Sequence, residues 1–467
     1  MVTEVTDGGV ATGEPDEPST RSERIGWYCY DWANSAFSTT VVTVFLGPYL
    51  TSVAKVAAGC ASDDPCRSGV IHPLGLSIAP GALFAYAVSL SVLLTVVVLP
   101  LVGAIADRSG RKKQLLALFA YLGAAATIGL VFLTGSRYLL GAGLFLVANI
   151  CFGASVVVYN SFLPQIAGPE QRDRVSSIGW AAGYLGGGLL LLLNVVAVLG
   201  KDAIGVDTAQ VARYSLASAG VWWALFTTVP LLRLRNRPPT AGPGPVSGGG
   251  GSALRDGFRQ LWHTVRGLKQ YPLSLFFLIA YLVYNDGIQT VIALSGTYAT
   301  EELRLPDDVL VPTILMVQFL AFGGALALGA LAKRIGAWKA LLISLVIWVG
   351  IVAVVFTLPT GQAGPFIATG GAIGVVLGGS QALSRSLFSQ LIPAGKEGEY
   401  FGLYEISDKG TSWLGPMLFG LAFDLTRSYR VAIVSLLVFF IVGFVALAAV
   451  PIRRAIVAAG NTPPRLL

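Results

Sequence analysis

Charged residues are scarce in this chain. Only 12% of its 467 residues are Asp, Glu, Lys or Arg, which is about half the share found in an ordinary soluble domain. Hydrophobic residues make up 54%. Because a helix needs about 20 consecutive apolar residues to cross a bilayer, the chain can supply about a dozen crossings. The composition excludes a soluble enzyme, a disordered protein and a nucleic-acid-binding domain, and it predicts a polytopic membrane protein.

Histidine is scarcer still, and cysteine is rare. The two histidines, His72 and His263, fall in loops predicted on opposite sides of the membrane, and the four cysteines lack the spacing of a metal site. No set of nucleophile, base or metal ligands is recognisable. We therefore expect no enzymatic activity, no metal and no cofactor.

Two of the four cysteines lie close together. Cys60 and Cys66 both fall in the outer loop after the first predicted span, with the polar, turn-rich segment 62–65 between them. That side of the membrane is oxidising in a bacterium, so a local disulfide is expected. Cys29 and Cys151 lie in predicted helices and should remain free thiols.

Runs without charged residues define the predicted membrane spans. Nine such runs are long enough to cross a bilayer, and 340–384 is long enough for two helices divided by the turn Leu358–Gly361. Two further spans, about 270–299 and 400–423, carry charges inside them. The predicted fold is an all-α membrane protein with twelve transmembrane helices.

Polar segments divide these helices into two groups. Residues 1–24 have the composition of a disordered tail, and a segment rich in Pro and Gly separates the sixth span from the seventh. The basic stretch 255–269 after that segment is expected to form a surface helix against anionic lipid. The predicted organisation is a six-helix bundle at 25–235, a cytoplasmic linker at 236–269, a second six-helix bundle at 270–453, and a tail at 454–467.

Lys and Arg are distributed unevenly between the predicted loops. If the N-terminus is cytoplasmic, 22 of the 32 basic residues fall on the cytoplasmic side and 8 on the outer side. The other two, Arg385 and Lys409, lie within spans. Because cytoplasmic loops carry the excess of positive charge, both termini are predicted to be cytoplasmic.

The two predicted bundles resemble each other in sequence. Shifting residues 103–113 by 226 positions aligns six identical residues, among them Gly103 with Gly329 and Arg108 with Arg334. Two parallel, pseudo-symmetric halves are the architecture of secondary transporters, whose substrate binds between the halves near the bilayer midplane. The repeat therefore predicts a secondary active transporter that works by alternating access.

Several motifs resemble a known family. Asp107-Arg108-Ser109-Gly110-Arg111-Lys112, between spans two and three, resembles the signature loop of the major facilitator superfamily. Tyr30-Asp31-Trp32-Ala33-Asn34-Ser35-Ala36-Phe37 is similar to the autophagy-linked vacuole effluxers (amino-acid effluxer-like proteins) within that superfamily. The further patches that carry this likeness are 159–164, 284–287, 381–386 and 401–404. The resemblance covers almost the whole chain.

This resemblance implies export of amino acids or similar small metabolites, from the vacuole in fungi and across the cell membrane in bacteria. We expect a proton-coupled monomer whose partners are a small-molecule substrate, protons and the lipid bilayer. A drug or siderophore exporter of the same fold is an alternative, which a wide, neutral and aromatic-lined cavity would favour. A non-transporting membrane sensor is an alternative from another class.

Polar residues inside spans are the candidates for substrate binding and proton coupling. Asp31 and Asn34 share one face of span one, and an ionised carboxylate in a span is costly unless it faces a cavity or a partner. Asp31 could instead cap or pair at the membrane interface. Asp286 lies deep in span seven, which argues against an interfacial role and makes it the first candidate for carrying a proton. The remaining candidates are Asn160, Asn285, Gln289, Gln381 and Arg385.

A second group of charged residues suggests gates. Arg385 approaches the same end of the membrane as three charged residues of span eleven, so we expect a buried ion pair there, either static or opening as a gate. The resemblance implies that Asp107 and Arg111 brace the cytoplasmic face. Asp107 can pair with Arg108, with Arg111 or with the positive N-terminus of span eleven. The span-eleven residues are Glu405, Asp408 and Lys409.

Overall fold

The computed structural model describes residues 20–60, 66, 69–203, 205–238, 270–305, 307–409, 414–426 and 428–467. These residues form helices and no strand. Residues 1–19 of the predicted tail and residues 239–269 of the predicted linker, including the basic stretch 255–269, lie outside the described residues.

The N-terminal half, residues 20–238, begins with one long span that is α-helical at both ends and π-helical in the middle. A long connection leads from α2 to α3, the helices after α3 are joined by shorter loops, and Pro100 lies inside α3. The elements are α1 (Arg21–Ala36), the π-helix η1 (Phe37–Phe45), α2 (Leu46–Ala57), α3 (Leu83–Ser109), α4 (Lys112–Gly129), α5 (Tyr138–Asn160), α6 (Leu163–Ile166), α7 (Arg172–Leu199) and α8 (Thr208–Arg233).

The C-terminal half, residues 270–467, repeats this pattern of long helices. The turn expected at 358–361 separates α12 from α13, and Gly361 adopts a positive φ of 75° there. The elements are α10 (Pro272–Thr297), the π-helix η6 (Tyr298–Glu302), α11 (Asp307–Ile335), α12 (Ala337–Thr357), α13 (Ala363–Gln390), α14 (Glu397–Lys409), α15 (Leu414–Thr426), α16 (Tyr429–Ser435), α17 (Leu437–Ala449) and α18 (Ile452–Ala458).

The first helix begins earlier than the sequence suggested. The Thr20 hydroxyl accepts a hydrogen bond from the Glu23 backbone N–H at 3.2 Å, and the Glu23 carboxylate accepts one from the Thr20 N–H at 2.9 Å. This capping box satisfies two backbone groups at the start of the helix. Residues 21–24, which we expected in the tail, therefore form the first turn of α1.

Within the described residues, eleven helices are long and apolar enough to cross a membrane. The predicted span at 400–423 is not one of them. It corresponds to α14 and α15, two 13-residue helices on either side of residues 410–413, which lie outside the described residues. Four carboxylates lower the hydropathy of α14: Glu397, Glu399, Glu405 and Asp408.

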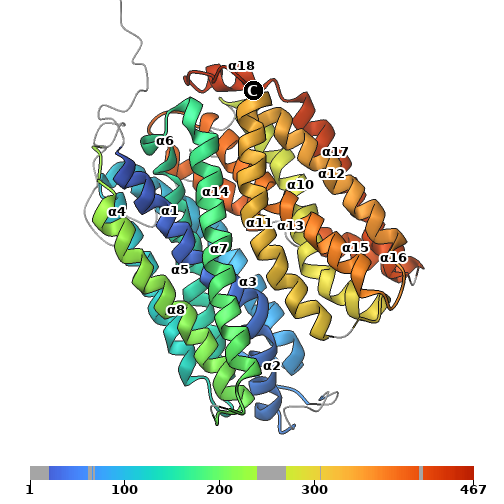
Figure 1. The fold of residues 1–467 in the computed structure, drawn as a ribbon. Coiled ribbons are helices and arrows are strands. Elements are labelled where there is room, and N and C mark those ends of the chain that lie inside the picture. Colours follow the sequence, from blue (N-terminus) through green and yellow to red (C-terminus); the bar gives the residue numbers. More distant parts are fainter. Residues whose placement is uncertain are drawn as a thin grey trace, which may run out of the picture.

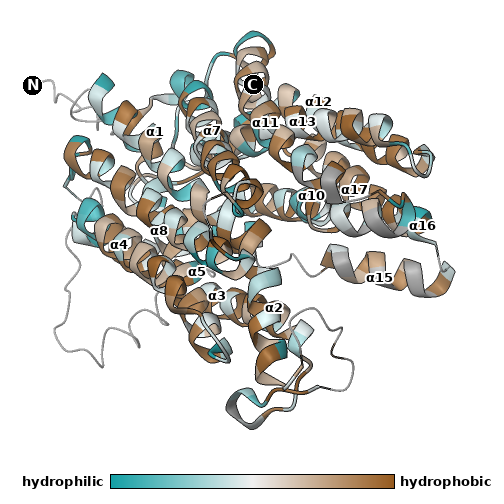
Figure 2. Cartoon of the chain, turned by 60° about the horizontal axis from the view of Figure 1, so that its bottom comes forward, coloured by the Kyte–Doolittle hydropathy of each residue, from teal (hydrophilic) through white to brown (hydrophobic). Residues whose placement is uncertain are grey.

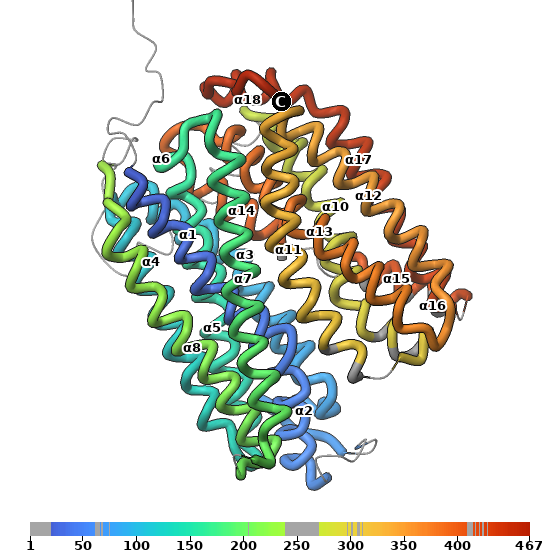
Figure 3. Tube along the Cα trace, in the orientation of Figure 1, coloured from blue at the N-terminus to red at the C-terminus, as the bar shows by residue number. Residues whose placement is uncertain are grey.

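Each half has its own hydrophobic core, and the helices of the two halves form two groups (Figure 1). The groups meet where α7 and α11 run side by side (Figure 3). Most of the helical ribbon is hydrophobic, and hydrophilic residues lie at several helix ends (Figure 2). Large apolar side chains such as Leu93 and Leu193 are exposed, as expected for a surface that lipid covers. This is a multi-pass membrane protein.

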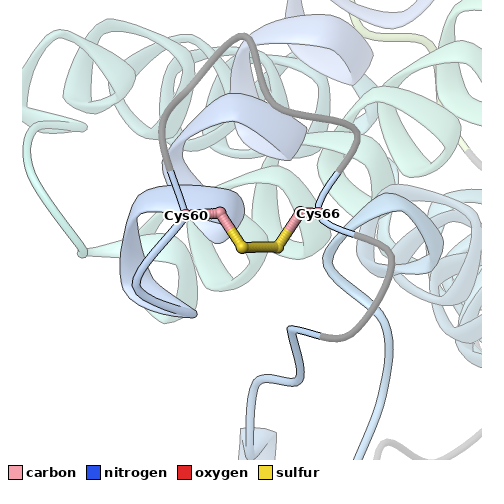
Figure 4. Close-up of a disulfide and its surroundings, with 2 residues drawn as sticks. All are labelled: Cys60 and Cys66. Atoms are coloured by element: carbon pink, nitrogen blue, oxygen red, sulfur yellow. A yellow bond between two sulfur atoms is a disulfide. The ribbon is translucent and has the colours of Figure 1, made fainter.

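α1 begins at the same end of the molecule at which α18 lies (Figure 1). We call this end the termini face and the other end the opposite face. The loop after α2 lies on the opposite face and contains a disulfide between Cys60 and Cys66, whose Cα atoms are 5.8 Å apart (Figure 4). Cys29 and Cys151 are free thiols.

We expect this disulfide to persist in the purified protein. Peptide mass spectrometry without reductant should find Cys60 and Cys66 linked, and only Cys29 and Cys151 alkylated after unfolding. Adding a reductant before alkylation provides the control, because all four residues should then react. Alkylation of Cys60 and Cys66 in the unreduced sample would contradict the prediction.

Candidate functional site

A cavity of about 500 Å³ lies between the two halves. Its lining runs from Gln381 and Asp408, inside the bundle, to Leu310, Leu358 and Phe366 near the opposite-face ends of α11, α12 and α13. The π-helix η1 lines one side of it. A cavity of this size between packed helices is typical of a site for a small molecule.

Arg385 of α13 lies between the cavity and the termini face, and its side chain extends into the N-terminal half. Its Nη1 donates to Asp31 Oδ2 at 3.1 Å, and its Nε and Nη2 donate to the hydroxyl and the carbonyl of Ser176, each at 2.9 Å. Nη1 also lies 3.4 Å from Asn160 Oδ1. The guanidinium group is thus bound almost entirely by side chains of the other half.

Three aromatic rings surround the same guanidinium group. Its carbon lies 4.8 Å from the ring centre of Trp27, 5.2 Å from that of Trp180 and 5.7 Å from that of Tyr159. The Tyr159 hydroxyl donates to Asp31 Oδ2 at 2.7 Å. Cation–π contacts of this kind strengthen when water is excluded, and Arg385 is buried.

The carboxylate that pairs with Arg385 is therefore not the one that we expected. Glu405, a candidate in span eleven, instead accepts a hydrogen bond from Asn160 Nδ2 at 3.0 Å, so Asn160 bridges Glu405 and Arg385. Removing one partner of a buried ion pair costs about 3–5 kcal/mol, because the other charge is left unpaired. The Asp31–Arg385 pair thus fixes the two halves against each other.

A second polar cluster lies at the inner end of the cavity. Asn285 Nδ2 donates to Asp408 Oδ1 at 3.0 Å, and Gln381 Nε2 donates to Asn285 Oδ1 at 2.8 Å. Tyr281 donates to the same Asp408 oxygen at 2.8 Å. Gln381 and Asp408 both line the cavity, so these predicted residues form part of its wall.

The other predicted binding residues lie in three different places. Gln289 lines the cavity, and Asn34 is buried in α1 one turn from Asp31. Asp286 is only 1% exposed and does not line the cavity. Neither of its carboxylate oxygens has a hydrogen-bond partner within the described ranges, although the backbone N–H of Gly415 is close enough to interact with the charge. Of Lys409, the structure describes only the backbone, at the end of α14.

The signature loop closes the termini face. Asp107 accepts hydrogen bonds from the backbone N–H groups of Gly398 at 2.8 Å and Glu399 at 3.0 Å, at the N-terminus of α14. Lys112 lies 3.3 Å from Asp107 and 3.7 Å from Glu397. Of the three partners considered for Asp107, it is therefore the N-terminus of span eleven, here α14, that Asp107 contacts. The partial positive charge of a helix N-terminus stabilises a carboxylate.

Lys112, and not Arg111, is the basic residue that joins this contact. Gly110 ends α3 in a left-handed conformation, with φ at 58°, and α4 begins at Lys112. This turn returns the chain so that the Lys112 side chain is buried, whereas Arg108 and Arg111 are exposed. Arg111 was one of three partners considered for Asp107, but the described contacts of Asp107 are with Lys112 and the N-terminus of α14.

Further contacts join the halves on the same side of the cavity. Arg172 Nη1 donates to the Ser389 carbonyl at 2.9 Å, and the Ser176 hydroxyl donates to the Ala382 carbonyl at 2.7 Å. Ser386 donates to Asp173. The molecule is thus closed toward the termini face, while its cavity extends toward the opposite face.

The repeated glycines lie at equivalent places in this closure. Gly103 of α3 packs against Gly398 of α14, and Gly329 of α11 packs against Ser177 of α7. A methyl group at Gly103 would overlap the Gly398 carbonyl. The sequence repeat therefore corresponds to two related helix crossings between the halves.

The sequence did not identify Tyr184 of the cavity wall or four residues that contact Arg385: Trp27, Tyr159, Ser176 and Trp180. Ser176, Trp180 and Tyr184 occur at intervals of four residues, which places them on one face of α7. Ser176 and Trp180 contact Arg385, and Trp180 and Tyr184 line the cavity. That spacing was a usable signal. Trp27 and Tyr159 gave none beyond their proximity to Asp31 and Asn160.

Comparison with known proteins identifies the family. Residues 19–460 match the family described as vacuole effluxer Atg22 like. The chain belongs to this family. The family predicted from the motifs is therefore confirmed, and this Atg22-like protein is a transporter rather than an enzyme.

Curated relatives match over most of their length. The Atg22-like chain is 28% identical over 427 residues to the uncharacterized MFS-type transporter YxiO of Bacillus subtilis strain 168, covering 91% of this chain and 94% of the relative. It is 26% identical over 539 residues to autophagy-related protein 22-1 of Penicillium rubens, covering 92% and 90%.

Solved structures establish the fold. The proton:xylose symporter XylE bound to 6-bromo-6-deoxy-D-glucose superposes with a TM-score of 0.64 at 13% identity, covering 91% of this chain and 94% of that one. A bacterial homologue of the iron transporter ferroportin, in an outward-facing state with soaked iron, gives 0.61 at 14% identity, covering 92% and 98%. The Atg22-like protein has the major facilitator fold.

Proposed function

We propose that this transporter exports amino acids or similar small metabolites by alternating access, in exchange for protons. The excess of Lys and Arg on the termini face supports a cytoplasmic location for that face. With this orientation the structure is outward-facing, since its cavity extends toward the opposite face. Export then requires the contacts on the termini face to open so that substrate can enter from the cytoplasm.

The observation that carries this proposal is the position of the cavity. It lies between two pseudo-symmetric halves, where secondary transporters bind substrate, and it ends at the polar cluster of Asn285, Gln381 and Asp408. Gln381 Oε1 is buried and has no hydrogen-bond partner in the described part of the chain. A substrate N–H group could satisfy this acceptor.

Asp286 supports the proton-coupling part of the proposal. Burying an ionised carboxylate without a partner is costly, whereas a protonated carboxyl group is tolerated far better. Its position on the helix that also supplies Asn285 and Gln289 links it to the cavity wall. Protonation and release at Asp286 would therefore be coupled to movement of α10.

The cavity lining also favours a second candidate, export of amphipathic organic compounds such as drugs. Most of the lining is apolar, and it includes five aromatic side chains: Phe152, Trp180, Tyr184, Tyr298 and Phe366. Asp408 is the one carboxylate among the described lining residues, which include no Lys or Arg. The aromatic lining is a feature that we expected of a drug exporter, whereas a carboxylate in the lining is not.

Purified protein in proteoliposomes with an acidic lumen separates these possibilities. A pH difference of one unit supports up to about tenfold accumulation for one-for-one exchange, since one unit corresponds to about 1.4 kcal/mol. Mass spectrometry of the lumen should find amino acids enriched from an external mixture, and a protonophore should abolish the enrichment. Enrichment of fluorescent amphipathic dyes instead would favour the second candidate. The sensor alternative would require a protein that moves no solute and binds a cytosolic partner.

Substitution of Gln289 tests the cavity directly. Gln289→Leu removes an amide from the lining while keeping a similar side-chain volume, so loss of one hydrogen bond should raise the KM for the transported solute about three- to tenfold. Thr228→Val, on the exposed surface of α8, is the control and should leave KM unchanged. Equal KM values in both variants would place the binding site elsewhere.

A further inference from the structure

The residues around Arg385 form a site for a cationic group. We call this site the cation socket and define it as Asp31, Asn160, Ser176 and the rings of Trp27, Tyr159 and Trp180. All six belong to the N-terminal half, on α1, α5 and α7, whereas Arg385 comes from α13 of the C-terminal half. The socket is therefore complete in one half, and the other half supplies its occupant.

Contacts among its own residues hold the socket in shape. The rings of Trp27 and Tyr159 stack with their centres 4.5 Å apart, and Trp27 Nε1 donates to the Tyr159 carbonyl at 3.0 Å. The Tyr159 hydroxyl orients Asp31 through their 2.7 Å hydrogen bond. None of these contacts involves Arg385, so they can persist when it withdraws.

The chemistry of the socket is specific for an organic cation. One carboxylate, three neutral acceptor atoms and three ring faces match a planar guanidinium group or an ammonium group. An anion would meet Asp31, and a neutral group would leave that carboxylate without a counter-charge. Position 179, next to the socket, requires glycine, because a methyl group there would overlap Trp27 and Asp31.

The alternating access proposed above would vacate this socket. Arg385 lies on the closed side of the cavity, among the contacts that must separate when the termini face opens. Its withdrawal with α13 leaves Asp31 facing the new cytoplasmic cavity with three unoccupied ring faces. A cation that enters at that moment replaces the interactions that Arg385 made.

We propose that, when the termini face is open, the cation socket binds the guanidinium or ammonium group of a cationic solute, such as a basic amino acid, in place of Arg385. This inference rests on the alternating access proposed above and adds a substrate class to it. Arg385 then acts as an intramolecular competitor. Its return to Asp31 releases the solute's cationic group as the termini face closes.

The test uses L-arginine and L-citrulline, two amino acids of nearly the same shape that differ in the positive charge of the side chain. The whole chain carrying Arg385→Ala has an unoccupied socket. At constant ionic strength, titration calorimetry should find that this variant binds L-arginine at least tenfold more tightly than L-citrulline, and at least tenfold more tightly than the unaltered protein binds L-arginine.

Two further variants keep the result interpretable. Asp31→Asn combined with Arg385→Ala removes both charges and should bind the two amino acids equally. Asp107→Asn, which vacates the socket by opening the termini face and leaves its residues intact, should show the same preference for L-arginine even if Arg385→Ala does not fold. Folded Arg385→Ala protein without this preference, or a preference that survives Asp31→Asn, would overturn the assignment.

These measurements separate the socket from the transport function. If the socket variants show no preference for L-arginine while proteoliposomes export other amino acids, the cation socket is wrong and the proposed transport stands. If L-arginine binds as expected but proteoliposomes move no solute, the socket stands and the proposed transport fails.

Discussion

Asp286→Asn protein is expected to lose gradient-driven accumulation of substrate and to keep exchange at equal concentrations. Asn cannot carry a proton but has nearly the same shape as Asp, so α10 should keep its packing and Gln289 its place in the cavity wall. A proton that crosses the membrane with its charge makes available about 2.3 kcal/mol per 100 mV. Loss of the carrier group removes this coupling and should reduce accumulation at least tenfold, to the level set by passive equilibration.

Inverted vesicles provide the measurement. Accumulation under an imposed proton gradient and counterflow without a gradient are compared in the same preparation. Asp202→Asn, an exposed residue in the loop between α7 and α8, is the control and should change neither. If Asp286→Asn vesicles still concentrate the substrate, proton coupling lies at another carboxylate, and Asp31 becomes the next residue to substitute.

Much of the fold could be predicted because membrane burial leaves a simple record in the sequence. Long runs without charge must be helices, since no other open structure satisfies its backbone groups in lipid. The apolar signal is weakest at α14, where four carboxylates interrupt the pattern. Glu405 contacts Asn160 of the other half, whereas Asp408 contacts Tyr281 and Asn285 of its own half. Hydropathy gives little support for a helix that faces protein in this way.

The candidate site was harder to predict because its contacts join distant parts of the chain. The sequence marked Asp31, Asn160 and Arg385 as polar residues inside spans, and the structure brings all three together. It could not pair Asp31 with Arg385, which are 354 positions apart. Proximity along the membrane normal suggested Glu405 as the partner of Arg385, but the lateral position of each helix decides the pairing. Lateral positions depend on packing, for which a single sequence has no direct signal.

The partner of Asp107 was also only partly predictable from the sequence. The motif identified the carboxylate, and its charge suggested a helix N-terminus as one partner. The choice between Arg111 and Lys112 depended on how the left-handed Gly110 directs the chain into α4. Residue types alone do not determine that direction.

Asp107→Asn should therefore shift the conformational equilibrium toward opening of the termini face. The substitution removes the negative charge that Lys112 and the N-terminus of α14 stabilise. It also replaces one of the two oxygens that accept hydrogen bonds from the Gly398 and Glu399 N–H groups by an NH₂ group, which cannot accept one. Charged hydrogen bonds contribute about 1.5–3 kcal/mol each. A loss of about 2–3 kcal/mol changes the ratio of the two conformations by up to roughly 150-fold, while each half keeps its own core.

Two single-cysteine reporters can measure this shift in a background with Cys29 and Cys151 replaced. Ser389→Cys lies buried in the closed termini face, and Thr313→Cys lines the cavity. In the Asp107→Asn protein, labelling by an impermeant maleimide should increase at residue 389 and decrease at residue 313. Unfolding would increase labelling at both residues, so opposite changes identify a population shift.

Two further variants test the partner of Asp107. Lys112→Gln should shift labelling in the same direction as Asp107→Asn, whereas Arg111→Gln should have little effect because the Arg111 side chain is exposed. Unchanged labelling at both reporters would show that Asp107 does not hold the termini face closed.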